Sequence, residues 1–413
     1  MDVIRERCAG LDVHKATVTA CIRYPGPAGG RAQVIQTFGT TTPALLALRD
    51  WLGGYQVTHV AMESTGVYWK PVYYALEDAC QQVLLVNATH LAKVPGRKTD
   101  VQDCAWIAQL LECGLLRGSF VPPPAIRELR DLTRYRKTLI QDRTREVNRL
   151  HKLLEDAGLK LASVATDVLG ASGRAMLTAL VGGTTDPALL ADLARGRLRA
   201  KLPALRQALT GRFRGHHAFL LGQLLAHLDY LDEALATLSE GIEAHLAPFA
   251  AEAARLQTIP GVKQRTLEAI VAEIGVDMGR FPTAGHLASW AGLCPGNNAS
   301  AGKRRRGRSR KGDRWLKAAL VEASLAAVRV RGCALGARYR RLCRHAGHNV
   351  AIVAVAHAIL EIVWHLLTKQ TTYRELGADY IDRRDKERIA RRHVRLLEQL
   401  GYRVTAEPAS ITA

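Results

Sequence analysis

One long helical pattern, from Ala125 to Ala157, limits what this chain can fold into more than any other sequence feature. Apolar residues recur along it at helical spacing, and the prolines from Pro122 to Pro124 end whatever element comes before it. A second helical pattern runs from His217 to Leu246, and it predicts an antiparallel or intermolecular partner for the first. The simplest organisation is therefore a coiled-coil arm that separates two domains.

The rest of the chain predicts an α/β domain before the arm and a helical domain after it. Short alternating strands over residues 8–38 indicate an antiparallel meander, and strands alternate with helices from there to residue 113. Residues 158–215 predict only short helices. We expect four segments: an α/β domain (1–122), a helical arm with its linker (123–250), a helical C-terminal domain (251–378) and a basic helical tail (379–413).

The charge balance points to a polyanionic partner. The chain has 58 Lys and Arg residues against 38 Asp and Glu residues, a net charge of +20. Basic residues outnumber acidic ones in the 125–157 helix, and this stripe either contacts a nucleic-acid backbone or keeps the helix soluble. The basic residues of the stripe are Arg127, Arg130, Arg134, Arg136, Lys137, Arg143, Arg145, Arg149 and Lys152.

Cysteine usage and hydropathy favour a cytoplasmic protein without a membrane span; the polyanion-binding charge balance and the resemblance described below imply association with the nucleoid. The eight cysteines include no C-x-x-C pair, and the first ten residues lack an apolar signal segment. The spacing of Cys343, His345 and His348 does not favour zinc binding. The most apolar stretch, 350–367, carries polar residues at helical spacing, so we interpret it as a core helix.

Four carboxylates are candidates for a metal site. Asp12 lies inside the first strand, and Glu63 directly follows the strand at 57–62. Asp100 and Asp103 share one face of a predicted helix. If the sheet brings the strand ends beside this helix, the oxygen-rich cluster suits two Mg²⁺ ions. A D-x-x-D spacing alone is usually a solvated helix face. An Asp between apolar strand residues, however, is costly without a partner charge.

A second candidate is Ser300, in a loop of small residues that a cationic run follows. A P-loop is excluded because five residues separate Gly296 from Gly302 and Arg304 stands where a Ser or Thr would bind the metal. Ser300 is either a nucleophile whose attack on a phosphate the cations support, or an ordinary turn residue. The basic residues expected to contact phosphate here are Lys303, Arg304, Arg305, Arg306, Arg308, Arg310, Lys311 and Arg314.

The segment TIPGVKQRTLEAIVAEIG predicts a helix, a tight turn and another helix. It resembles a helix-hairpin-helix, in which the turn amides and the next helix N-terminus can hold a DNA phosphate. Gly261 and Lys263 are the residues expected to do so. An ordinary αα-hairpin is the alternative.

Several motifs together resemble the DEDD transposases of the insertion-sequence one-ten family. They are GLDVHK around Asp12, MESTGVYW around Glu63, KTDVQDCAWIAQLL around Asp100 and Asp103, and then IPGV, RFPTAGHLASWAGLCPG and SAGKRRRGRSRKGDRWL. The resemblance implies a ribonuclease-H-like domain of the RuvC type, a coiled-coil arm and a C-terminal transposase domain that contains a nucleophilic serine.

The resemblance also implies residue roles and partners. Asp12, Glu63, Asp100 and Asp103 match the metal-binding tetrad, and Ser300 in SAGK matches the serine, with Ser289 and Ser309 as nearby alternatives. Members of the family are recombinases that a bridge RNA guides to DNA. The resemblance also implies Mg²⁺ as the cofactor of the acidic site and a homo-oligomer built as a dimer of dimers. No nucleotide cofactor is expected, since a serine ester would preserve the energy of the phosphodiester bond.

Two other functions stay open at this point. The first is a metal-dependent DNA endonuclease of the junction-resolvase type, in which water is the nucleophile and Ser300 is structural. The second is an architectural DNA-binding protein without catalysis. A covalent link between the protein and DNA would separate the first from the recombinase, and an Asp12→Ala variant that kept its function would indicate the second.

Overall fold

The computed structural model describes residues 3–27, 29–64, 66–87, 103–296, 299–300, 303–304, 311–380, 383 and 386–405. Asp100 lies outside these ranges, as do Arg305, Arg306, Arg308, Ser309 and Arg310. The chain divides into two compact units, Met1–Val121 and Pro122–Ala413. The finer division of the second unit into arm, C-terminal domain and tail stays a prediction.

The first unit is built on a five-stranded sheet in the order β3-β2-β1-β4-β5. β1 (Cys8–Val13), β2 (Thr17–Pro25) and β3 (Arg31–Gly39) form an antiparallel meander, as predicted, while β4 (His59–Glu63) and β5 (Gln82–Val86) run parallel to β1. Because side chains alternate between the faces of a strand, Leu11 and Asp12 lie on opposite sides of this sheet.

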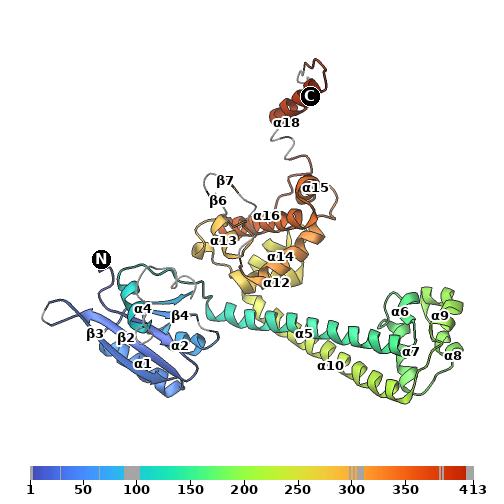
Figure 1. The fold of residues 1–413 in the computed structure, drawn as a ribbon, viewed down its shortest axis with the longest axis horizontal. Helices are drawn as coiled ribbons and strands as arrows, with labels where there is room; N and C mark the ends of the chain where they lie inside the picture. Colours follow the sequence, from blue (N-terminus) through green and yellow to red (C-terminus); the bar gives the residue numbers. More distant parts are fainter. Residues whose placement is uncertain are drawn as a thin grey trace. The chain divides into compact units, whose positions relative to one another are not determined.

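Helices cover both faces of the sheet (Figure 1). α1 (Thr42–Gly54) and α2 (Trp69–Leu76) bury their leucines against the face that contains Leu11. α4 (Asp103–Glu112) packs on the opposite face, where Ile107 and Leu110 contact Cys8 and Ala61. The mixed α/β domain predicted for the N-terminal part is confirmed, with Asp12 on the face that α4 covers.

The second unit begins with two long helices that run side by side, α5 (Pro124–Asp156) and α10 (Gly215–Leu246) (Figure 1). They are antiparallel: Asp156 at the end of α5 pairs with His217 at the start of α10, and Arg143 pairs with Asp232 midway along. The partner of the first long helix is therefore in the same chain, one of the two predicted possibilities.

Short helices join the far ends of α5 and α10, as predicted for residues 158–215. Their buried leucines, with those of α5 and α10, form one apolar core that contains Leu150, Leu177 and Leu221. The connecting elements are α6 (Leu161–Val164), α7 (Ala171–Val181), α8 (Pro187–Asp192), η1 (Gly196–Lys201) and α9 (Leu202–Ala208).

The part after α10 is mostly helical, and α16 runs through its core. α16 contacts α11, α13, α14 and α15. Its length and composition would allow it to cross a membrane, but more than half of its apolar window is buried inside the protein, which agrees with a core helix. The elements here are η2 (Ala247–Phe249), α11 (Ala250–Gln257), α12 (Gln264–Ile274), η3 (Met278–Arg280), α13 (Ala284–Trp290), β6 (Ala299–Ser300), β7 (Lys303–Arg304), α14 (Arg314–Ala327), α15 (Ala334–Ala346), α16 (His348–Lys369) and α18 (Lys386–Gln399).

Candidate functional site

Two of the predicted acidic residues lie side by side on the sheet. β1 and β4 are parallel neighbours, with Leu11 opposite Met62, so Asp12 and Glu63 come next on the two strands and face the same side. The Asp12 side chain is 28% exposed, and His14 Nε2 lies 3.1 Å from one of its oxygens. These residues end their strands at one edge of the sheet, where a ligand can reach them.

A third predicted acid, Asp103, is the first residue of α4, and Gly10 allows this helix to lie close to the Asp12 strand. A Cβ atom on Gly10 would lie 2.2 Å from the carbonyl oxygen of Cys104. Burial is the main cause of the raised pKa of the Cys104 thiol, and the nearby carboxylates of Asp12 and Asp103 raise it further. Both acids therefore lie near the first turn of α4.

The other end of α4 is fixed by a buried charge. Glu112 at the end of the helix is 3% exposed. It accepts hydrogen bonds from Arg23 Nε at 3.0 Å and Arg31 Nε at 2.6 Å, which come from β2 and β3. These bonds join the C-terminal end of α4 to β2 and β3.

The Gly10→Ala variant should distort this site. The added methyl group would overlap the backbone of α4, so the helix must move, and we expect a loss of about 1–3 kcal/mol in the free energy of unfolding. Urea denaturation of the full chain measures it. Gly53→Ala in α1 is the matched control, since a Cβ there meets nothing within 4 Å; equal losses in both variants would contradict the proposed role of Gly10.

Burial raises the pKa of the Cys8 thiol to about 12 and that of the Cys21 thiol to about 11. Cys8 begins β1, so it lies at the opposite end of the strand from Asp12, where the charge of Glu112 also acts on it. The predicted ligands beside Asp12 are carboxylates, whose oxygen atoms hard divalent cations prefer.

Ser300 lies in a short hairpin of the second unit. β6 and β7 pair antiparallel, with Ser300 opposite Lys303. The sequence predicts a loop here and misses this pairing, although a spacing of two residues is typical of tight hairpins. Of the alternative serines, Ser289 is exposed on α13.

The helices beneath the hairpin hold both ends of the segment that carries it. A Cβ on Gly312 would lie 2.3 Å from the amide nitrogen of Gly292, so the residues just before and just after the segment touch. Asp313 then caps α14, because its carboxylate accepts hydrogen bonds from the amides of Trp315 and Leu316 at 2.9 and 2.7 Å.

Three of the predicted phosphate-binding residues have described side chains, and they lie near the starts of α12 and α14, as does Gly261. Lys311 and Arg314 are exposed at the start of α14, and Lys263 is exposed before α12. Gly261 has a φ of +85°, and a Cβ on it would lie 2.2 Å from the carbonyl oxygen of Ala323, so this turn packs against α14. The turn glycine thus has a packing role that the sequence did not reveal.

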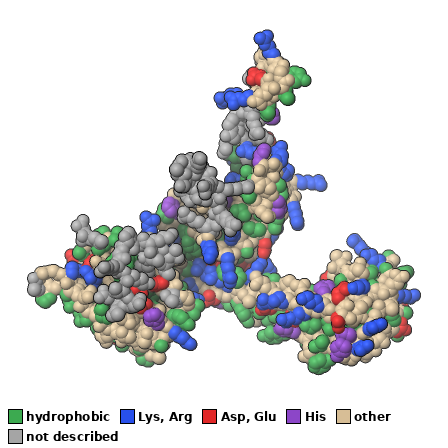
Figure 2. Space-filling model, viewed as in Figure 1, with side chains coloured by type: hydrophobic (Ala, Val, Ile, Leu, Met, Phe, Trp, Pro, Cys, Tyr) green, Lys and Arg blue, Asp and Glu red, His purple; other side chains and the backbone are tan. Residues whose placement is uncertain are grey.

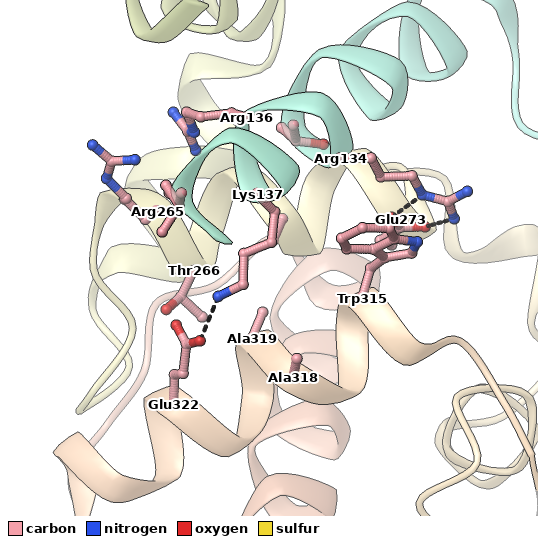
Figure 3. Close-up of a pocket in the computed structure, with 13 residues that line it drawn as sticks. Arg134, Arg136, Lys137, Arg265, Thr266, Glu273, Trp315, Ala318, Ala319 and Glu322 are labelled. Carbon is pink, nitrogen blue, oxygen red and sulfur yellow. Dashed lines mark hydrogen bonds and ion pairs between the residues drawn. The ribbon is translucent and has the colours of Figure 1, made fainter. Parts of the chain in front are cut away.

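A buried charge network joins α5 to α12 and α14, and no sequence pattern predicted it. Glu273 is 1% exposed; Arg134 donates to it from Nε at 2.8 Å and from Nη2 at 2.7 Å (Figure 3). Arg130 lies 3.2 Å from the same carboxylate, and Arg134 also reaches Asp313 at 3.2 Å. Desolvation raises the pKa of Glu273, and the hydrogen bond from Arg134 opposes this shift.

This network changes the interpretation of the basic stripe on α5. Arg136 also turns inward and pairs with buried Glu268. Carboxylates of the protein itself pair with seven of the nine stripe residues, and three of these, Arg130, Arg134 and Arg136, pair with buried acids and so have a structural role that neither prediction included. The seven are Arg130, Arg134, Arg136, Lys137, Arg143, Arg145 and Arg149.

A group of two histidines and an acid lies at the far end of the arm. Ligand atoms of Asp156, His216 and His217 are all within 4.8 Å of one another. Both histidines lie in the first turn of α10, and His217 Nδ1 accepts the backbone N–H of Arg214. The proton of a neutral His217 then sits on Nε2, which faces Asp156 at 3.0 Å. A metal-bound imidazole instead donates from its second nitrogen, so this group is better described as a helix cap.

Comparison with known proteins bears on both regions. A family model for the DEDD transposases of IS110, described as "Transposase", matches residues 9–158, and another, described as "Transposase IS116/IS110/IS902 family", matches residues 253–340. The first match contains Asp12, Glu63 and Asp103, and the second contains Ser300.

Curated relatives agree with these matches. The chain is 28% identical over 334 residues to a "Probable family 20 transposase" of Pseudomonas aeruginosa, covering 79% of this chain and 89% of the relative. It is 27% identical over 324 residues to the "Transposase for insertion sequence element IS1111A" of Coxiella burnetii (76% and 79%). It is 28% identical over 396 residues to the "Insertion element IS110 uncharacterized 43.6 kDa protein" of Streptomyces coelicolor (88% and 94%). The chain therefore belongs to the IS110 family of transposases, which are DNA-binding and DNA-processing enzymes.

Proposed function

We propose that this transposase cuts and rejoins DNA strands through a covalent bond between Ser300 and a DNA phosphate. The observation that supports this most is that Asp12 and Glu63 directly follow the paired residues Leu11 and Met62 on adjacent parallel strands, near the first turn of α4 where Asp103 lies. Three carboxylates at one sheet edge form a site for phosphodiester chemistry that depends on divalent metal ions. The α/β domain with this edge is consistent with a ribonuclease-H-like fold of the RuvC type.

The donor set fits Mg²⁺. Asp12, Glu63 and Asp103 offer only oxygen atoms, which Mg²⁺ prefers as ligands. Asp100 is the fourth proposed ligand. When bound there, Mg²⁺ would place positive charge against the oxygens of the scissile phosphate. His14, which contacts Asp12 and is mostly exposed, stands where it can donate to the same phosphate.

The proposed reaction balances without a nucleotide cofactor. Ser300 Oγ attacks the phosphorus, its proton leaves to a base or water, and the bond from phosphorus to a deoxyribose oxygen breaks. The released strand end takes up a proton as a hydroxyl. In the second step, the hydroxyl of another strand attacks the phosphoserine and releases Ser300, so the energy of the phosphodiester bond is preserved. The cations from Lys303 to Arg314 would stabilise the charge on the phosphate.

Two proposed partners rest on the resemblance to the family. The first is a bridge RNA that selects the DNA targets, and the second is further copies of this chain in a dimer of dimers. In such an assembly the acidic site of one subunit would act with Ser300 of another. The net charge of +20 supports a large polyanionic partner but does not distinguish RNA from DNA.

Trapping the covalent intermediate tests the proposal. The full-length protein, its co-purified RNA, Mg²⁺ and a labelled DNA substrate are mixed, and the products are separated under denaturing conditions. We expect a protease-sensitive protein–DNA adduct that Ser300→Ala abolishes. Ser289→Ala is the matched control because this serine is exposed on the neighbouring helix α13, and it should leave the adduct in place.

Other outcomes would identify the alternative functions. If Ser300→Ala still cleaves DNA and the wild type never forms an adduct, the protein is a hydrolytic endonuclease. If neither Ser300→Ala nor Asp12→Ala changes the function of the complex, it is an architectural binder. Either result would overturn the phosphoserine mechanism.

A further inference from the structure

A pocket of about 340 Å³ lies among α5, α12 and α14, within the second unit. Figure 3 shows Trp315 and the Arg134–Glu273 pair at one end, and Lys137 and Glu322 toward the other. Small and apolar side chains complete the lining, among them Ile140, Ala269, Ala318 and Ala319. Its size and its mixture of apolar surface with a few polar groups are typical of small-ligand sites.

One end of the pocket offers an aromatic ring. The Trp315 indole is partly exposed, and the guanidinium carbon of Arg314 lies 4.6 Å from its centre. Asp313 caps the helix through the Trp315 backbone amide, and the guanidinium carbon of Arg134 lies 5.8 Å from the ring centre. An accessible indole is a surface on which a planar base can stack.

The charges at the mouth suit a phosphate. The Lys137–Glu322 ion pair, 2.7 Å long, has exposed side chains, so it contributes little to stability and can open. Arg265 is also exposed and forms no hydrogen bond or ion pair with any residue that the structure describes. It occupies the first turn of α12, where the helix dipole also favours a negatively charged ligand.

The pocket also lies between two segments that the sequence independently predicts to contact phosphates. Arg265 comes two residues after Lys263 of the turn before α12, and Trp315 follows the cationic run that ends at Arg314. Lys and Arg side chains gather where α5 meets the C-terminal helices (Figure 2). A nucleic-acid strand that contacts both segments would pass over the mouth of this pocket.

We propose that the pocket binds a single unpaired nucleotide, with its base against Trp315 and its phosphate at Arg265 and Lys137. The nucleotide comes from a bulge or loop of a bound RNA or DNA, in which the base can leave its helix. This inference goes beyond the phosphoserine mechanism, since it concerns recognition of the nucleic acid and requires no cleavage.

Binding of matched probes tests the proposal. Fluorescence anisotropy of the full-length protein, without divalent metal, is measured with three labelled hairpins: fully paired, with one bulged nucleotide, and with the same bulge made abasic. Each hairpin is prepared as RNA and as DNA, so comparing the two arms of the experiment shows which nucleic acid supplies the bound nucleotide. We expect the bulged probe to bind roughly 5- to 150-fold more tightly than the abasic one in at least one arm.

Variants connect this preference to the pocket. Trp315→Ala should remove it, whereas Trp315→Phe, which keeps an aromatic ring, should retain most of it. Arg265→Gln changes only an exposed side chain and should lower the salt dependence of binding by about one phosphate contact. Tyr230→Ala, an exposed aromatic on α10, is the control that should change nothing.

Two results would overturn the proposal: equal affinity of the wild type for the bulged and abasic probes in both arms, or a preference that survives Trp315→Ala. If Trp315→Ala fails to fold, an unchanged salt dependence in Arg265→Gln would overturn it as well. Ser300→Ala should keep the preference, so failure of the covalent mechanism and failure of this pocket are separable.

Discussion

The Asp12→Asn variant is expected to cleave DNA about 10³-fold more slowly than the wild type. The amide keeps the size of the side chain but removes a negative charge from the row that Asp12 forms with Glu63. A metal site is worth several kcal/mol to the transition state, and about 4 kcal/mol corresponds to this change in rate. The rate of strand cleavage in saturating Mg²⁺, with a titration of Mg²⁺ affinity beside it, measures the effect.

Asp50→Asn is the control for this variant. Asp50 lies in the same unit, on α1, where it pairs with Arg49 at the surface, and its side chain is 69% exposed. Its replacement should leave the cleavage rate and Mg²⁺ affinity unchanged. Cleavage by Asp12→Asn at the wild-type rate would exclude Asp12 from the chemistry.

The second large effect concerns stability. Glu273→Ala should lower the free energy of unfolding of the C-terminal helices by about 3–5 kcal/mol, because it leaves Arg130 and Arg134 without the buried carboxylate that pairs with both. The loss should be largest around α12 and α14, which this network joins to α5. Hydrogen–deuterium exchange, resolved by peptide, measures the loss of protection in these helices.

An exposed ion pair serves as the control for Glu273→Ala. Asp232 pairs with Arg143 between the two long helices, but its side chain is 51% exposed. Asp232→Ala should therefore cost at most about 1 kcal/mol. If both variants lose the same protection, the burial of Glu273 has no special importance and the network does not hold the helices together.

Patterns that depend on near neighbours could be predicted from the sequence. The meander, the long helices at 124–156 and 215–246 and the helix from residue 103 follow from period and from proline positions. Asp12 and Glu63 could be identified because each interrupts or ends an apolar strand, where burying a carboxylate costs free energy unless it has a partner charge. The parallel pairing of β1 with β4 then places them side by side.

Contacts between distant parts of the chain could not be predicted in this way. Glu273 and Arg134 are 139 residues apart in sequence, and nothing in either segment indicates the other. The basic residues of α5 therefore resembled a solvent-facing or nucleic-acid-binding stripe, although several point into the protein. The roles of Gly10 and Gly261 could not be predicted for the same reason. Each glycine allows a distant backbone segment to approach closely, and nothing in the sequence near the glycine indicates that contact.

The contact between Gly312 and the Ala291–Gly292 peptide has a consequence for the evolution of specificity. A stretch of chain whose two ends meet at a fixed point can be lengthened, shortened or exchanged at small entropic cost, since closure depends only weakly on length. The residues around Ser300 can thus be exchanged as one unit between relatives. Chimeras that take these residues from a relative should leave the packing of the helices unchanged while changing the residues that contact DNA.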